Sequence, residues 1–324
     1  MSVRSLVTKY RSLSWFDAVF YSGFVVYAAF VVSEALSPSV VLTFSSTEYA
    51  AEVPAAVGSA IGFGAGFAGG VFGAFIGVLT VTFLTLFGGL PLTLAKGTSV
   101  FQAAFTSFFA VSNHYRSGTA DIRAGAVVGV GGIVGAALGA AWSAGLDEAS
   151  MRGVFSAVLV GGAVYMARES VKSGRGKIES TDRSLGFVPD LLKLSGSYKG
   201  VSYRIDLLTS VLLGLGVGFV AGLLGVGGGF LLTPSINVIL GLPIHVAVGT
   251  SSSVVMANSV SATTEYVSQG AVFFKLSIAV LVGGFFGVRL GQKVNHRLPD
   301  RALKAAFSVL LVWSAWRMMP QIQM

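Results

Sequence analysis

The sequence predicts an all-α polytopic membrane protein: two inverted-topology repeats with broken or re-entrant helices, plus one extra N-terminal helix. Three observations predict this class. Hydrophobic residues make up 53% of the 324 residues and charged residues only 11%. Charges are nearly absent from runs of about 20 residues, the length that a helix needs to cross a bilayer. The second half of the chain repeats the first, and Lys and Arg gather in a few connections.

The composition excludes several kinds of site. With no cysteine there is no disulfide framework, thiolate metal site or cysteine nucleophile, and three scattered histidines do not suggest a metal centre. We therefore expect no cofactor, no metal and no enzyme activity. The net charge of +8 could indicate nucleic acid, but in a membrane protein it marks cytoplasmic loops, so we expect no nucleic-acid partner. The expected partners are the lipid bilayer and a small anion, and a homo-oligomer stays open.

The first 36 residues are predicted to form a transmembrane helix with a cytoplasmic start. Arg4, Lys9 and Arg11 precede the apolar run 15–32. A cleaved signal peptide is the alternative, which the length of this run and the many later spans disfavour. Residues 37–53 contain no Lys or Arg and are predicted to be external.

An internal repeat organises the rest of the chain. Residues 62–168 align with residues 214–320 at a constant offset and without a gap. The aligned motifs include "GLP" (89–91 and 241–243), "GTS" (97–99 and 249–251) and six glycines of the first Gly-rich span. We predict a first transmembrane repeat at 54–168, a linker at 169–204 with no folded domain, and a second repeat at 205–324.

Charge predicts that the repeats are inverted. In each repeat a short apolar piece, 76–88 or 230–240, follows the Gly-rich span and suits a half-helix or re-entrant segment. If span and piece together return the chain to one side, each repeat crosses an odd number of times. The N-terminus and the basic linker are then cytoplasmic, and the C-terminus is external. An even number of crossings in each repeat would place the basic linker outside, against the positive-inside rule.

The glycines carry two different signals. Rows at i, i+4 spacing, such as Gly131, Gly135 and Gly139, are typical of close helix packing in a bilayer. The G-x-G-x-x-G at Gly64 lacks the strand and the acidic residue of a dinucleotide site. Neither reading explains three consecutive glycines followed by Pro234, which predict a sharp unwinding of the helix.

An unwound point at membrane depth exposes backbone N–H groups, and the short helix that follows directs its positive end there. Such ends bind oxyanions. We therefore predict a substrate site at Gly227, Gly228 and Gly229. The matching stretch 73–81 is a weaker candidate because Phe75 and Ile76 replace two of the glycines.

The "GTS" motifs form a second candidate site. Their hydroxyls either cap helix starts or line a substrate site. The predicted binding residues here are Thr98, Ser99, Thr250, Ser251 and Ser252, with the amide of Asn258 further along the second helix. We expect the two helix starts to face each other near the midplane, where the substrate sites of inverted-repeat folds lie.

Two charged residues are candidates for coupling or attraction. Lys96 could attract an anion or extend to the membrane interface. Glu265 could carry a proton if buried, although a solvated helix end explains it as well.

The motifs "GVGGGFLLTP" (225–234), "GLP…AVGTS" (241–251) and "EYVSQGAV" (265–272) resemble the TauE/SafE family, the sulfite exporter TauE/SafE-like membrane permeases. The resemblance covers about 54–168 and 205–320. The first half departs from the pattern at Phe75, Ile76 and Thr82. The resemblance implies export of small sulfur-containing anions such as sulfite and organosulfonates.

The sequence thus favours a secondary transporter in the cell membrane that exports a small oxyanion by alternating access. An anion channel would use the same site with a continuous pore. A membrane-embedded enzyme is disfavoured because no cluster of His, Asp and Cys converges. An inside-negative potential favours expulsion of a monoanion by roughly 2.3 kcal/mol per 100 mV.

Overall fold

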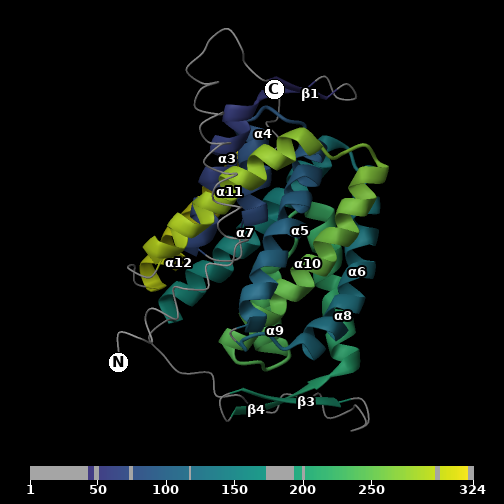
Figure 1. The fold of residues 1–324 in the computed structure, drawn as a ribbon, viewed down its shortest axis with the longest axis vertical. Helices are drawn as coiled ribbons and strands as arrows, with labels where there is room; N and C mark the ends of the chain where they lie inside the picture. The colour runs from purple at the N-terminus through teal and green to yellow at the C-terminus, as the bar shows by residue number, and fades with distance from the viewer. Residues whose placement is uncertain are drawn as a thin grey trace, which may run out of the picture.

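The computed structural model describes residues 43–46, 51–72, 76–116, 118–172, 193–198, 201–295 and 300–319. The predicted N-terminal helix, within residues 1–36, lies outside these ranges. Helices dominate what is described, and the strands form two short hairpins (Figure 1).

The strands β1 (Thr43–Ser46) and β2 (Ala51–Pro54) precede the helices of the first repeat, which are α3 (Ala55–Phe72), α4 (Ile76–Leu86), α5 (Leu92–Arg116), α6 (Ile122–Ala144) and α7 (Glu148–Lys172). The strands β3 (Lys193–Tyr198) and β4 (Val201–Asp206) precede those of the second, which are α8 (Leu207–Leu224), α9 (Gly229–Ile239), α10 (Ile244–Ser268), α11 (Phe274–Asn295) and α12 (Asp300–Met318). The bounds of α3 and α8, and those of α5 and α10, coincide when the constant offset of the sequence repeat is applied. The helices of the two sequence repeats therefore follow one another in the same order.

An antiparallel hairpin precedes the Gly-rich helix of each repeat. The sequence predicted neither hairpin. The strand β1 and most of β2 lie within the stretch 37–53 that was predicted to be external, and β3 lies within the linker 169–204. Figure 1 shows β1 at one end of the helix bundle and the β3–β4 hairpin at the opposite end. The two repeats therefore start from opposite ends.

The repeats are interlocked because each Gly-rich helix packs against a helix of the other repeat. In the α3–α11 pair, a Cβ on Gly62 or Gly66 would overlap the backbone oxygen of Val280 or Gly284. In the α8–α6 pair, a Cβ on Gly214 would overlap the backbone oxygen of Val128. Glycine at these positions lets the backbones touch, as the small-residue rows predicted.

Further helix pairs also join the repeats, and α10 packs against α6 as well as α5. The helices α5 and α10 cross at the centre, and α7 packs against α12. Among the described helices, α6, α7, α8 and α11 are long and apolar enough to span a bilayer, whereas α4 and α9 have 11 residues each. The central helices α5 and α10 reach 25 residues but carry more polar side chains.

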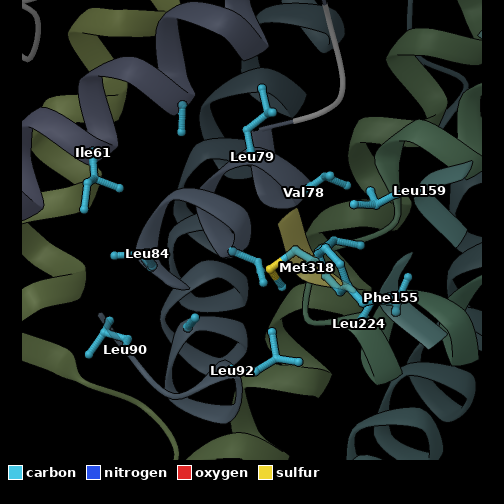
Figure 2. Packing of buried hydrophobic residues seen from close by; sticks show 14 of the residues in the cluster. Ile61, Val78, Leu79, Leu84, Leu90, Leu92, Phe155, Leu159, Leu224 and Met318 are labelled. Atoms are coloured by element: carbon cyan, nitrogen blue, oxygen red, sulfur yellow. The ribbon is translucent and has the colours of Figure 1, made fainter. Parts of the chain in front are cut away.

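The largest apolar core surrounds α4 and the end of α8. Figure 2 shows Val78 of α4 beside Leu224, Phe155 and Met318, which come from α8, α7 and α12. Their side chains are at most 2% exposed. Leu224, the last residue of α8, is thus held in this core, and Gly225 and Gly227, which follow it, pack against α5 and α10.

Candidate functional site

The helix break between α8 and α9 is the centre of the candidate site. Gly225, Gly227 and Gly228 have φ angles of 68°, 70° and 83°, in the left-handed region that favours glycine. The N–H of Val226 still donates to the oxygen of Ala221 at 3.2 Å, which closes α8. The chain then turns sharply and α9 begins at Gly229.

Three successive backbone N–H groups lie at this break. Those of Gly227, Gly228 and Gly229 have no hydrogen-bond partner among the described residues, and all three glycines are buried. Further along, the N–H groups of Leu231 and Leu232 both donate to the oxygen of Gly228. Buried N–H groups without partners are rare in proteins. Because they also stand at the positive end of α9, they can hold an oxyanion.

The break lies between the two central helices. A Cβ on Gly227 would stand 2.8 Å from the Oγ of Ser259 on α10 and 3.2 Å from the Cβ of Ala103 on α5. Ser259 is fully buried, and its hydroxyl has no partner within the described part of the chain. Ser259 was not predicted from the sequence, although an unpaired buried hydroxyl beside the free amides makes it part of the site.

The short helix α4 of the first repeat begins against the break. A Cβ on Gly77, in the first turn of α4, would overlap the backbone of Val226 in the break. The hydroxyl of Ser99 donates to the oxygen of Gly77 at 3.0 Å, which ties α4 to α5. The Oγ1 of Thr80 donates to the Oε1 of Gln102 at 2.8 Å, a second link between these helices that was not predicted.

Lys96 lies against the start of the break. Its side chain is 1% exposed, and its Cβ would overlap a Cβ on Gly225. Its Nζ lies 5.6 Å from the centroid of the Tyr266 ring, whose hydroxyl donates to the oxygen of Gly222 at 2.8 Å. The predicted alternative of an extension to the membrane interface is therefore wrong, because neighbouring helices enclose this side chain.

The two "GTS" motifs do not meet. Gly97 packs against the backbone of Ala271, just after α10, and Gly249 packs against that of Thr119, just after α5. The two helices are therefore antiparallel, with one motif on each side of their crossing. Gly227 lies beside Ala103 of α5 and beside Ser259 of α10. With a rise of about 1.5 Å per residue from there to each motif, the two motifs are roughly 15–20 Å apart along the helices. The expectation that they face each other near the midplane is wrong.

Most of the predicted polar side chains make contacts within the protein. The hydroxyl of Thr250 accepts from the N–H of Asp121 at 3.1 Å, and Ser251 bonds Thr233 of α9 at 2.8 Å. Ser252 donates to its own helix at 3.1 Å. The amide of Asn258, oriented to donate, reaches the oxygens of Gly132 and Val254 at 3.2 Å. The buried Oγ1 of Thr98 has no partner among the described residues.

Glu265 lies in the last turn of α10, away from the break. It is half-buried, and its Oε1 accepts from the Nε2 of Gln269 at 3.0 Å. The described residues contain no group of three His, Cys, Asp or Glu side chains that could hold a metal ion.

The β3–β4 hairpin is connected to the "GTS" motif of α10 through Asp121. The hydroxyl of Tyr203 donates to the carboxylate of Asp121 at 2.7 Å, and Asp121 also caps α6. Burial and this carboxylate raise the pKa of Tyr203 above its usual value of 10.0. The hairpin thereby links the linker to Thr250 through Asp121.

The chain is similar to a described protein family and to several probable membrane transporter proteins. The family model described as Sulfite exporter TauE/SafE matches residues 58–318. The probable membrane transporter protein YdhB of Bacillus subtilis is 28% identical over 232 residues, which cover 70% of this chain and 84% of YdhB. The probable membrane transporter protein YunE of the same organism is 24% identical over 225 residues, 68% of this chain and 78% of YunE. No solved structure gives a significant match.

These matches confirm the resemblance found in the motifs. Together with the apolar helices, they make this chain a multi-pass membrane protein related to membrane transporters. The chain therefore belongs to the sulfite exporter TauE/SafE family.

Proposed function

We propose that the protein is a secondary transporter that exports a small sulfur-containing oxyanion, such as sulfite or an organosulfonate. The observation that carries the proposal is the buried set of free amides at Gly227, Gly228 and Gly229 beside the unpaired hydroxyl of Ser259. Several donors gathered in one buried place suit an anion with several oxygens. The sulfur chemistry comes from the family alone.

Alternating access would use the interlocked repeats. The hairpins at opposite ends, the short returning helices and the basic linker support an inverted arrangement with the linker in the cytoplasm. The break lies at the crossing of α5 and α10, one helix from each repeat. Rocking at this crossing would expose the anion first to one side and then to the other.

The remaining predicted residues keep roles in this proposal. Thr98 has an unused hydroxyl on the side of Lys96, whereas Thr250, Ser251 and Ser252 lie on the other side of the crossing. An anion leaving the break on the first side would meet Thr98, and one leaving on the other side would meet the three hydroxyls of the second motif. Asn258 holds α6 against α10 in the present state.

Replacement of Ser259 tests the site with little disturbance of the fold. Ser259→Ala should weaken anion binding about tenfold or more, because hydrogen bonds to charged groups contribute roughly 1.5–3 kcal/mol. The matched control is Ser107→Ala at the equivalent position of the first repeat, where the hydroxyl donates to the oxygen of Ala103 at 2.6 Å. Concentration-dependent flux of sulfite and methanesulfonate into proteoliposomes measures both variants.

Replacement of Gly228 gives a stronger test of the break itself. Gly228→Leu should abolish flux because the position needs a φ of 83° and a Cβ would lie 2.7 Å from the Cβ of Ala221. Gly216→Leu on the open face of α8, where nothing lies within 4 Å of a Cβ, is the control. Wild-type flux in a folded Gly228→Leu protein, or in Ser259→Ala, contradicts the anion site.

Kinetics and labelling test the transporter mechanism and its topology. A transporter shows saturable flux and counterflow, and a channel shows neither at low substrate. Because the chain has no cysteine, Ala149→Cys in the exposed first turn of α7 gives a single thiol. An impermeant maleimide should label it in intact cells but should not label a cysteine in the linker 173–192. The reverse pattern contradicts the proposed orientation.

A further inference from the structure

The buried charge at the candidate site belongs to one repeat alone. Lys96 on α5 is 1% exposed, whereas its counterpart on α10 in the second repeat is Val248, which is 38% exposed. The backbone positions are equivalent, because Gly97 and Gly249, which follow them, pack against equivalent loops. The duplicated fold therefore does not require a lysine here.

Lys96 has no acidic partner in the part of the chain that the structure describes. The ion pair found there joins Arg152 to Glu148 at 2.8 Å. The Tyr266 ring, whose centroid lies 5.6 Å from the Nζ of Lys96, offers only partial negative charge. A full positive charge enclosed by membrane helices is costly without a counter-ion, and such residues commonly mark the path of a substrate or ion.

The position of Lys96 relates it directly to the break. It contacts Gly225 at one end of the break, and Ala103, two helical turns further along α5, contacts Gly227 at the other. Two turns of helix correspond to about 10 Å. Over that distance, in a medium of low dielectric constant, a full charge still acts on an anion at the free amides.

We propose that Lys96 determines the charge specificity of the site and makes it select monovalent over divalent anions. The inference rests on the proposed function. The free amides supply only partial charges, so Lys96 is the full positive charge that an anion at the break would meet. One negative charge neutralises it, whereas a divalent anion leaves an uncompensated negative charge in a buried site. Lys96 thus acts on the substrate through its field.

Charge-neutral replacement of Lys96 tests this assignment. The probes are methanesulfonate as a monovalent anion and sulfate as a divalent one, with uptake measured in proteoliposomes held at zero membrane potential. Lys96→Met should raise the half-saturating concentration of methanesulfonate about tenfold and reduce its preference over sulfate. Lys96→Arg, which keeps the charge, should retain both properties. Lys275→Met removes an exposed lysine of α11 and should behave as the wild type.

A purely structural lysine gives a different result. If Lys96 only stabilises the end of α8, Lys96→Met lowers the melting temperature and the maximal rate but leaves half-saturation and anion preference unchanged, which overturns the inference. Lys96→Gln allows the same comparison if the Met variant does not fold. A wild type that transports both anions with equal half-saturation also overturns it. A wild type that transports neither methanesulfonate, sulfate nor sulfite overturns the proposed function and this inference together.

Discussion

The two repeats have nearly the same backbone but different chemistry at equivalent positions. The second repeat holds the glycine break and the unpaired Ser259, whereas the equivalent Ser107 bonds its own helix. The first repeat holds the buried lysine and the hydrogen bond between Thr80 and Gln102. The candidate site therefore draws on residues of both halves, and the residues that it needs differ between the repeats.

The equivalent positions show which features the scaffold itself needs. The glycine rows occur in both repeats, and each row lets two backbones touch. The polar groups of the first repeat have apolar counterparts, since Leu232 and Val254 occupy the places of Thr80 and Gln102 and are fully buried. We expect equivalent substitutions in the glycine rows to destabilise the protein equally in either repeat. Substitutions of the polar groups should have an effect only in the repeat that contains them.

The largest expected effect is the loss of fold when a row glycine becomes bulky. Gly62→Leu and Gly214→Leu should each destabilise the protein by about 3 kcal/mol or more, because the new side chain meets backbone atoms that cannot move aside. The melting temperature and the fraction of monodisperse protein after purification measure the loss. Gly216→Leu, on the open face of α8, should leave both nearly unchanged. A large difference between the first two variants would break the equivalence of the repeats.

An intermediate effect is expected where the first repeat is changed to match the second. Thr80→Leu or Gln102→Val alone should cost about 1–3 kcal/mol. The first leaves the buried Oε1 of Gln102 without its donor, although the Nε2 still donates to the oxygen of Val280 at 3.4 Å, and the second leaves the Oγ1 of Thr80 without its acceptor. The double variant copies the apolar pair of the second repeat and should recover most of that loss. A double-mutant cycle on thermal stability measures the coupling. Additive losses would show that the two side chains do not depend on each other.

The smallest expected effect on stability concerns the hydrogen bond between Tyr203 of the β3–β4 hairpin and Asp121, which has no equivalent at the β1–β2 hairpin. Tyr203 bonds Asp121, whereas their counterparts Ala51 and Phe273 have no such groups. Because the folded-state pKa of Tyr203 is raised, its contribution is complete below about pH 10 and is lost at higher pH. Tyr203→Phe should therefore be slightly less stable at neutral pH and lose less stability in alkali.

Melting temperatures from about pH 8 to about pH 11 measure this difference. Tyr115→Phe, which removes a tyrosine that is 63% exposed, is the control. A Tyr203→Phe protein with the same alkaline loss as the wild type would show that the hairpin contact does not carry the effect.

Much of the fold follows from the sequence because the alignment of the two repeats can be read from the residues alone. The constant offset between the repeats gives α8 and α10 from α3 and α5 without adjustment. The hairpins escaped prediction because their strands share almost no residues between the repeats and are too short to show a period. Strand pairing at a bundle end depends on what the helices leave room for.

The candidate site could be predicted only in part. Three consecutive glycines require an unusual backbone, so the break was visible at Gly227. The relation between the "GTS" motifs was not, because it depends on how α5 and α10 cross. Ser259 and Thr80 are single hydroxyls in apolar stretches, which resemble many residues that only bond their own helix. The depth of Lys96 likewise depends on neighbours far away in the sequence.

The interlocked helix pairs also set an order for biosynthesis. When α8 is made, its partner α6 is already in place, whereas α3 must wait for α11, since Gly62 packs on Val280, which is made only after α4 to α10. Until then the bare glycine face of α3 stays open to lipid or to other proteins. A chain that stops before α11 should therefore be recognised as unfinished and degraded. Two fragments split in the linker should survive only when a cell makes both.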